Sequence, residues 1–229
     1  MKHNITKIYH INGVEIKIHG FSSGLVSIKN KMRENNYTGL LAQMTFLIDA
    51  TFTEWMPIFS WVIEHPEGIF LIDAGQIEVA QHSEYYNSVN PILKRVNTSL
   101  IKYKIKDDEN IENQLAKLGI EKSQISKIIL THLHIDHMNG INYFPSTKIL
   151  VNKVEWKKPY GNLPTLYPKW FKPTKVNFTD TFENFDKAKY LTNDKTMVYI
   201  QTSGDTYGHS SVMLKTDEGY LFFSGDLCY

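Results

Sequence analysis

The sequence predicts an α/β domain built from two related halves, and three features support this fold class. Apolar or alternating strand-like segments recur along the chain, with a strong helical pattern between them. Residues 62–75 and 213–226 each run from an apolar strand through a turn ending in Glu-Gly to a second apolar strand and a small residue beside an aspartate. A group of histidines directly follows another apolar strand. The repeated pattern indicates a duplicated half-domain, with two unrelated hairpins as the competing interpretation.

The first part of the chain predicts two hairpins and a long excursion. Residues 5–19 alternate between apolar and polar residues around Asn12 and Gly13, and an Asn-Gly pair between such runs is a strong hairpin signal. Residues 56–75 give two apolar runs around a second turn. Residues 76–107 show no clear period, and loops of that length are usually functional or disordered.

A helix and a buried strand lead into the histidines. Residues 107–120 place apolar side chains on one helical face, with Asp107 or Asp108 available as the N-cap and Gly119 where a C-terminal glycine belongs. Residues 127–131 are mostly apolar and predict a buried strand. This strand therefore delivers the histidines at the edge of a sheet.

The second half predicts further strands and one aromatic loop. Residues 159–173 contain four prolines together with Tyr, Trp and Phe, which excludes regular structure and indicates a loop lying over another part of the protein. Strands are expected at residues 148–152, 196–202, 211–216 and 220–224. If residues 213–226 begin a second copy of the half-domain, we expect the helix and last strand of that copy to lie beyond residue 229.

Composition limits the partners and the location that we expect. The 229 residues fit one large domain, residues 1–229. The formal net charge of +1 gives no general electrostatic case for binding nucleic acid or an anionic membrane. The single cysteine, Cys228, excludes an intramolecular disulfide and suits a reducing cytosol. The sequence shows no signal peptide and no run of the ~20 apolar residues that a membrane span needs, so we expect a cytoplasmic location.

The stretch ILTHLHIDHMNG, residues 129–140, carries four candidate metal ligands. His132 and His134 face the same side of an extended backbone, while Asp136 and His137 follow as the chain turns. Imidazole nitrogens with a carboxylate oxygen are the ligand set of zinc and, less preferentially, of iron or manganese. Four mixed ligands exceed what one catalytic metal needs, which favours two metals that make a bridging hydroxide available at neutral pH. A solvated loop is the competing interpretation, and the apolar strand before it argues against that.

Two residues from the second half are further candidate ligands. His209 stands just before an apolar strand and after Gly208, and Asp226 follows another apolar strand and Gly225. A neighbouring glycine lets backbone and metal come close. Taken alone, either residue is an ordinary turn residue. Together with the first cluster they become predicted ligands, and the two oxygens of Asp226 can bridge two metals.

Three motifs in this order, THLHIDHMNG, GDTYGHSS and FFSGDLCY, preceded by FLIDAG, resemble the metallo-β-lactamase superfamily. The resemblance extends from about residue 57 to residue 229. It implies an αβ/βα sandwich of two mixed β-sheets flanked by helices. It also implies an internal duplication and a dinuclear metal site at one edge of the two sheets.

The resemblance implies roles for individual residues. Asp226 bridges two divalent metal ions, with zinc preferred, and Asp73 supports a ligand histidine through a hydrogen bond. The ligands of the first ion are His132, His134 and His209, and those of the second ion are Asp136 and His137. The family supplies a further histidine to the second ion from a late strand, but no histidine follows His209 here. We therefore expect that ligand, and the last elements of the fold, in a C-terminal segment outside this sequence.

Within the superfamily, the sequence is most similar to the N-acyl homoserine lactonases, which act in quorum quenching. Their pattern places a tyrosine three residues after the bridging aspartate, where this chain has Tyr229. The segments 76–107 and 159–173 suit a pocket for a small molecule with an acyl tail, and Trp170 and Phe171 are the candidates for lining it. Residues 76–107 are also a candidate surface for a homodimer.

The resemblance implies a hydrolase that opens the lactone ring of an N-acyl homoserine lactone. The hydroxide between the metals attacks the carbonyl carbon, Tyr229 donates a hydrogen bond to the developing oxyanion, and Asp136 or a metal-bound water returns the proton to the alkoxide. A glyoxalase II-type thioesterase and a β-lactamase remain alternatives on the same metal core. A non-catalytic metal-binding relative is an alternative from a different class. The near-neutral charge disfavours a nuclease.

Overall fold

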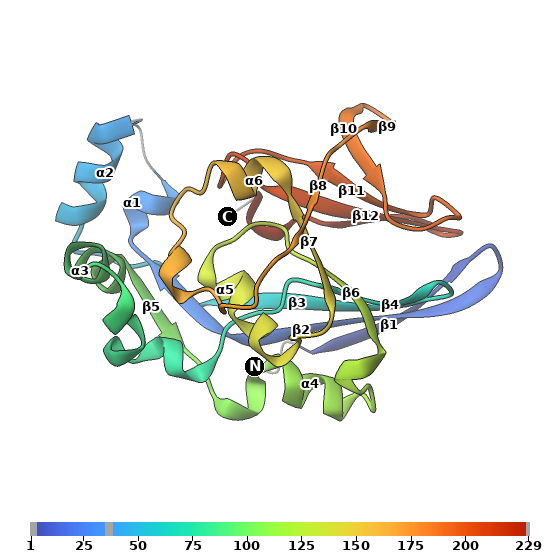
Figure 1. Ribbon diagram of the computed structural model, residues 1–229, viewed down its shortest axis with the longest axis horizontal. Helices are drawn as coiled ribbons and strands as arrows, with labels where there is room; N and C mark the ends of the chain where they lie inside the picture. The colour runs from blue at the N-terminus through green and yellow to red at the C-terminus, as the bar shows by residue number, and fades with distance from the viewer. Residues whose placement is uncertain (1–3, 35–38, 228–229) are drawn as a thin grey trace.

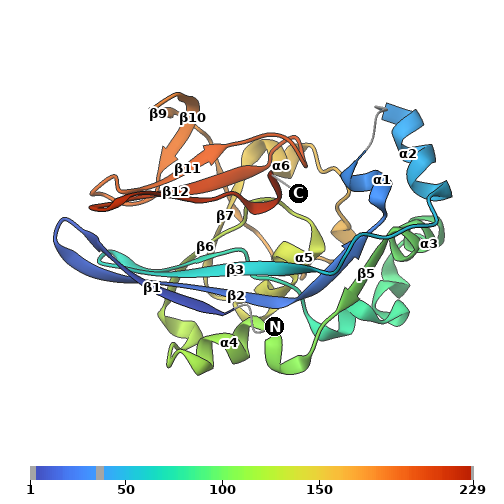
Figure 2. The same ribbon diagram turned by 180° about the vertical axis from the view of Figure 1, so that it is seen from behind.

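Two β-sheets stacked face to face form the centre of the protein (Figure 1). The computed structural model describes residues 4–34 and 39–227. The larger sheet has eight strands and the smaller sheet has five. The view from behind shows the same two layers, with the N-terminal strands in the larger sheet and the last strands of the chain in the smaller one (Figure 2).

The larger sheet is mixed. Its strands follow the order β1-β2-β3-β4-β6-β7-β8, and β5 pairs with the last residues of β2. Neighbours from β1 to β4 run antiparallel, whereas β4, β6, β7 and β8 run parallel. The strands are β1 (Ile5–Ile11), β2 (Val14–Ile28), β3 (Met56–His65), β4 (Gly68–Ile72), β5 (Ile101–Lys104), β6 (Ile125–Ile129), β7 (Lys148–Asn152) and β8 (Thr174–Val176).

The smaller sheet is antiparallel throughout, in the order β13-β12-β11-β10-β9. Its strands are β9 (Asp180–Phe182), β10 (Phe185–Tyr190), β11 (Met197–Gln201), β12 (Ser210–Thr216) and β13 (Gly219–Phe223). The prediction of two stacked sheets is confirmed, and it differs from the structure in one detail. Only the larger sheet is mixed, because consecutive strands of the smaller sheet are joined by hairpins or short loops and therefore reverse direction each time.

The hairpins predicted from the sequence are present. Asn12 and Gly13 take positive φ values of 50° and 76° between β1 and β2, as a tight two-residue turn requires. The carboxylate of Asp217 accepts hydrogen bonds from both backbone amides of this turn, at 3.0 Å from Asn12 N and 2.8 Å from Gly13 N. The two repeated segments form the hairpins β3–β4 and β12–β13, one in each sheet. Each sheet therefore contains one copy of the repeated pattern.

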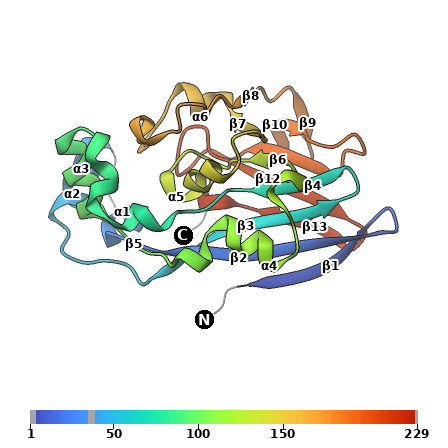
Figure 3. The ribbon, with the colours of Figure 1, turned by 60° about the horizontal axis from the view of Figure 1, so that its bottom comes forward.

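Six α-helices lie within the described residues. They are α1 (Asn30–Arg33), α2 (Gly39–Ile48), α3 (Pro91–Leu100), α4 (Ile111–Lys117), α5 (Ile135–Met138) and α6 (Lys153–Lys157). Figure 3 shows α2 and α3 grouped at one end of the sheets and α4 beside the larger sheet. Among the described residues, no helix has both the length and the apolar character that crossing a membrane demands.

Two stretches differ from the prediction. One contains more regular structure than expected, and in the other the helix starts later than expected. Residues 76–107 contain two 3-10 helices, α3 and β5 rather than a loop. The side chain of Asn90 accepts hydrogen bonds from the first amides of α3, and Pro91 follows it in the first turn. Helix α4 begins at Ile111, and its N-cap is Asn110 rather than an aspartate. The preceding aspartates are in a 3-10 turn, which puts Asn110 at the helix start.

The main core lies between the two sheets. The inner faces of both sheets contribute fully or nearly fully buried side chains, among them Ile16, Ile18, Phe70, Ile129, Leu150, Tyr199, Val212 and Leu214. A second core covers the other face of the larger sheet, where Ile111 and Leu115 of α4 and Met138 of α5 pack on the sheet. The last residues of β4 (Phe70–Ile72) and of β6 (Ile128 and Ile129) are buried on both faces, which explains their apolar sequence.

One buried hydroxyl joins the two sheets near the ends of the parallel strands. Tyr199 of β11 has no exposed surface, and its hydroxyl donates to Leu130 O at 2.7 Å. The same oxygen accepts from Asn152 N at 3.2 Å. Ser210 N, at the start of β12, donates to Thr131 O at 2.9 Å. These contacts hold the end of β6, and the residues that follow it, against the smaller sheet.

We expect Tyr199→Phe to lower the free energy of unfolding by about 1–3 kcal/mol, because it leaves a buried carbonyl and a buried amide without their partner. Urea unfolding followed by circular dichroism measures the change. Tyr190→Phe is the matched control, since its hydroxyl makes one exposed contact, 3.4 Å from Thr181 O. Equal stability of the two variants would contradict the role of the Tyr199 hydroxyl.

Candidate metal centre

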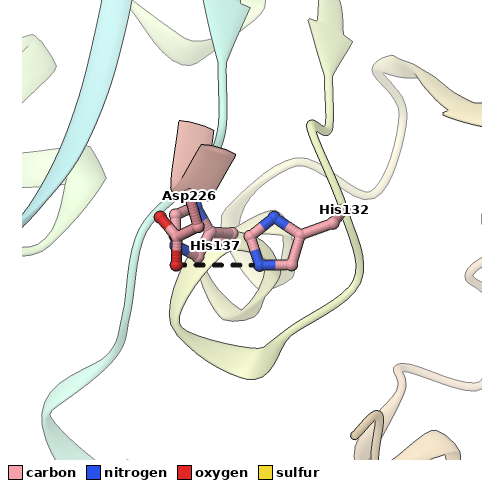
Figure 4. Close-up of side chains that lie close together, drawn as sticks. All are labelled: His132, His137 and Asp226. Carbon is pink, nitrogen blue, oxygen red and sulfur yellow. Dashed lines mark ion pairs between the residues drawn. The ribbon is translucent and has the colours of Figure 1, made fainter. Parts of the chain in front are cut away.

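The predicted ligands gather at one edge of the sandwich. His132 and His134 follow β6, and Asp136 and His137 lie in α5, directly after them. Figure 4 shows the side chains of His132, His137 and Asp226 pointing toward one another. Residues of the larger sheet and of the smaller sheet therefore meet here, as the sequence predicts for the ends of these strands.

Asp73, at the end of β4, is the buried carboxylate that organises the histidine loop. It is 3% exposed and has a φ of 54°, a left-handed conformation that is uncommon outside glycine. Its Oδ1 accepts from Thr131 N at 2.8 Å, and its Oδ2 accepts from Thr131 Oγ1 at 2.8 Å. The same Oδ2 lies 2.9 Å from His137 Nδ1, which donates to it because a carboxylate can only accept.

The hydrogen bonds of Thr131 fix the tautomer of His132. The Thr131 hydroxyl donates its single proton to Asp73, so at 3.0 Å from His132 Nδ1 it acts as an acceptor. The proton of the ring is therefore on Nδ1, and Nε2 presents a lone pair. His132 is completely buried, and burial holds its pKa well below the usual range. Its Nε2 has no hydrogen-bond partner among the described residues.

His137 and Asp226 form the second part of the site. His137 Nε2, opposite the nitrogen bound to Asp73, lies 3.1 Å from Asp226 Oδ1. Asp226 Oδ2 lies 4.0 Å from His132 Nε2. Burial opposes the charged form of His137, but the carboxylates of Asp226 and Asp73 outweigh it and raise the pKa of this ring. The carboxylate of Asp226 thus lies between two imidazole nitrogens.

His134 lies beside an aspartate that the sequence does not single out. His134 Nε2 donates to Tyr160 O at 3.1 Å, so its Nδ1 faces the site, 3.2 Å from Asp205 Oδ2. Burial opposes the charged form of His134, but Asp205 outweighs it and raises the pKa to about 9. Asp205 stands four residues before His209 in the loop SGDTYGH, where it resembles any turn aspartate. Position in the fold, not a sequence signal, identifies it.

His209 also presents a lone pair to the site. Its Nδ1 donates to Thr202 O at 3.0 Å, and its Nε2 accepts from Asp226 N at 3.2 Å. Its ring centre lies 5.2 Å from that of His132. Gly225 has a φ of 57°, and a Cβ there would come within 2.8 Å of His209 Nε2 and 2.9 Å of Thr131. Only glycine therefore lets the chain pass this close to the ring.

The donor set fits divalent metal ions. Hydrogen bonds to the outer nitrogen of each of the four histidines direct the other nitrogen inward, toward the carboxylates of Asp205 and Asp226, which is how proteins orient metal-binding histidines. Two groups have all their ligand atoms within 4.8 Å of one another: His132, His137 and Asp226, and His132, His134 and Asp205. The unpartnered, fully buried His132 Nε2 belongs to both groups.

Among the described residues, Asp136, Trp170 and Phe171 belong to neither of these groups. Asp136 lines a cavity of about 360 Å³ together with Asp73, His137 and Asp226, and burial raises its pKa. Phe171 is 6% exposed and packs against Trp156 in the second core. That packing follows from its loop lying on the larger sheet, and it turns Phe171 away from the cavity, whose lining residues include neither Phe171 nor Trp170. Tyr229 lies outside the described residues.

Residues 53–229 match the sequence profile of the Metallo-beta-lactamase superfamily, which is most of the chain. The chain belongs to the metallo-beta-lactamase superfamily. This membership agrees with the stacked sheets and with the position of the histidine motif at their edge. The family supports divalent metal binding, and the described residues include two groups of histidines and aspartates that could hold a metal ion.

Several relatives within the superfamily are N-acyl homoserine lactonases. The chain is 25% identical over 187 residues to N-acyl homoserine lactonase AttM of Azorhizobium caulinodans, covering 76% of this chain and 66% of that protein. It is 26% identical over 179 residues to N-acyl homoserine lactonase AiiA of Bacillus thuringiensis subsp. kurstaki, covering 76% of this chain and 65% of that protein. The chain thus spans just under two thirds of the length of these curated relatives.

Solved structures with the same fold include two lactonases. An N-acyl homoserine lactone hydrolase with the product N-hexanoyl-L-homoserine at its catalytic metal center has a TM-score of 0.70 and 19% identity, covering 93% of this chain and 76% of that one. AidC, a dizinc quorum-quenching lactonase, has a TM-score of 0.56 and 15% identity, covering 98% of this chain and 82% of that one. At these identities the likeness establishes the fold of the superfamily.

Glu155 of α6 connects two loops of the metal centre, and no sequence pattern indicates this role. Its side chain is completely buried. Oε1 accepts from Leu133 N, between the first two histidines, at 3.1 Å. Oε2 accepts from Thr206 Oγ1 at 2.6 Å and from Gly208 N at 3.2 Å. In the sequence KVEWKK it reads as an ordinary charged helix residue.

We expect Glu155→Gln to lower the free energy of unfolding by about 1–3 kcal/mol, because an amide replaces one carboxylate oxygen and leaves one buried backbone amide without an acceptor. We also expect metal affinity to fall by about 10-fold or more, since the histidine loop loses a support. Urea unfolding and isothermal titration with zinc measure the two effects. Glu84→Gln, on an exposed residue, is the control. A variant as stable as that control would show that Glu155 does not hold these loops.

Proposed function

We propose that the chain acts as a metal-dependent hydrolase that opens the lactone ring of N-acyl homoserine lactones. The observation that carries the proposal is the unpartnered, fully buried Nε2 of His132, which faces two carboxylates and needs a cation. Curated relatives named as N-acyl homoserine lactonases support the choice of substrate. The substrate remains a proposal because the chain spans less than two thirds of those relatives.

Two divalent metal ions, with zinc preferred, are part of the proposal. His132, His134 and His209 are the proposed histidine ligands of one ion, and Asp136 and His137 are the proposed ligands of the other. Asp226, which lies between His137 and His132, is the proposed shared ligand. When bound, such ions supply a water that is ionised near neutral pH and an electrophile for the carbonyl oxygen of the lactone.

The protein's own groups position the site and carry the proton. Asp73 holds His137 through its Nδ1 and holds His132 through the Thr131 hydroxyl, so that Nε2 of both rings faces the site. Burial raises the pKa of Asp136, which suits a carboxyl that returns a proton to the leaving alkoxide. Tyr229, three residues after Asp226, is the proposed hydrogen-bond donor to the carbonyl oxygen.

A homodimer remains a proposal for the same protein. Helix α3 lies within residues 76–107, the candidate contact surface. Its side chains Ile92 and Leu93 are 73% and 55% exposed. Exposed apolar side chains next to one another are typical of a contact surface. Analytical ultracentrifugation of the protein decides between a monomer and a dimer.

We expect protein loaded with two equivalents of zinc to hydrolyse N-acyl homoserine lactones and to lose this activity when a chelator removes the metal. The assay follows the ring-opened product across several acyl lengths, on protein of known intact mass and metal content. We expect Asp226→Asn to lower kcat/KM by about 100-fold or more, since even residues that only orient ligands contribute 10–100-fold.

A thioester and a β-lactam serve as control substrates for the two alternative hydrolases. Faster turnover of either one would replace the lactonase assignment. Metal-loaded protein that hydrolyses none of the three substrates would support a metal-binding relative without this activity.

A further inference from the structure

We propose that Asp205 is itself a ligand of the metal ion held by His132 and His134. Asp205 would then add a carboxylate to the imidazoles of His132, His134 and His209, which are the proposed ligands of that ion. The inference rests on the proposed metal-dependent function and names a ligand of that same site.

The geometry places Asp205 in the middle of the two histidines. Its Oδ2 lies 3.2 Å from His134 Nδ1 and 3.4 Å from His132 Nε2. These three atoms form one of the two groups whose members all lie within 4.8 Å of one another. The side chain of Asp205 is 16% exposed, and that of His132 is fully buried. A cation placed among the three atoms would therefore be shielded from most of the solvent.

The atoms of this group are arranged as the ligands of a metal ion would be. Each ring has its outer nitrogen committed elsewhere, His134 Nε2 to Tyr160 O and His132 Nδ1 to Thr131 Oγ1. Within the described part of the chain, neither Asp205 Oδ2 nor His132 Nε2 makes a hydrogen bond, although they are close together. A proton on the ring needs a nearly linear approach to the oxygen, whereas a metal ion needs only convergent lone pairs.

His209 remains a proposed ligand of the same ion. Its Nε2 faces the site, 3.2 Å from Asp226 N. Among the described residues, His209 belongs to neither of the close groups, whereas Asp205 belongs to the group of His132 and His134.

The loop that carries Asp205 is fixed on both sides of it. The Thr206 hydroxyl donates to Glu155 Oε2 at 2.6 Å, and Gly204 N donates to Thr206 O at 3.3 Å. Ser203 Oγ donates to Tyr207 O at 2.8 Å. Because Glu155 also holds Leu133, one buried carboxylate sets the distance between Asp205 and the two histidines.

A carboxylate ligand changes which metal the site prefers. Carboxylate oxygen is a harder ligand than imidazole and suits manganese and iron as well as zinc. It also adds a negative charge beside that of Asp226. We therefore expect this site to accept Mn²⁺ or Fe²⁺ more readily than a site with histidine ligands alone.

The test is a titration of metal-free protein with Co²⁺, followed by isothermal titration calorimetry and by the visible absorption of the bound ion. We expect Asp205→Asn to weaken one of the bound equivalents by about 10-fold or more and to change its visible spectrum, because the coordinating atoms differ. Asp186→Asn, the same change at an exposed position on β10, is the control and leaves both signals as in the wild type.

The outcomes separate a ligand from a residue that only positions one. Weaker binding with an unchanged spectrum would overturn the ligand role, since Asp205 would then act through a histidine. Unchanged binding and spectrum would overturn it as well. If Asp205→Asn does not fold, Asp205→Glu keeps a carboxylate, and we expect it to bind Co²⁺ with an altered spectrum; an unaltered spectrum counts against the ligand role.

The same measurements distinguish failure of this inference from failure of the proposed function. Wild-type protein that binds no Co²⁺ would overturn both. Wild-type protein that binds Co²⁺ as expected, with the predicted effect of Asp205→Asn but without lactone hydrolysis, supports the ligand and rejects only the substrate.

Discussion

The carboxylate of Asp73 is the constraint on which the rest of the site depends. It accepts from the backbone and the hydroxyl of Thr131 and from His137 Nδ1, all below 3 Å. Through these bonds one buried group sets the proton positions of two histidines, His137 directly and His132 by way of the threonine. An asparagine at this position would replace one of the two accepting oxygens with an amide group, which donates and therefore cannot accept these hydrogen bonds. The uncommon backbone conformation of Asp73 persists because these bonds over-determine it.

The site exists only where both sheets meet. The larger sheet contributes the histidine loop and Asp73, and the smaller sheet contributes His209 and Asp226. The Tyr199 hydroxyl and the contact between Ser210 N and Thr131 O hold these two sets at a fixed separation. Glu155 adds a third connection, between the histidine loop and the loop of Asp205. Buried hydrogen bonds thus fix the positions of these loops, as apolar packing fixes the positions of the sheets.

The sequence predicts the hairpins, the stacked sheets and the position of the histidines, because each depends on a local pattern. Asn12-Gly13 specifies a turn, and the apolar run before His132 specifies a buried strand. It does not predict Asn110 as the N-cap of α4, since Asp107 and Asp108 are equally suitable capping residues. Nor does it predict Asp205 or Glu155, whose roles depend on contacts between residues that are far apart in the chain. In the sequence alone, Glu155 cannot be distinguished from an exposed helix residue, and Asp205 cannot be distinguished from a turn residue.

The separation in sequence of the groups that meet at the site has a kinetic consequence. Asp73 contacts residue 131, Glu155 contacts residues 133 and 206, and His137 contacts Asp226. Such distant pairs close only after both sheets have formed, so the metal pocket is among the last features to assemble during folding. Metal ions that bind only the completed pocket then shift the folding equilibrium toward the folded protein. A bound metal ion would therefore stabilise the folded protein against the open forms that proteases attack.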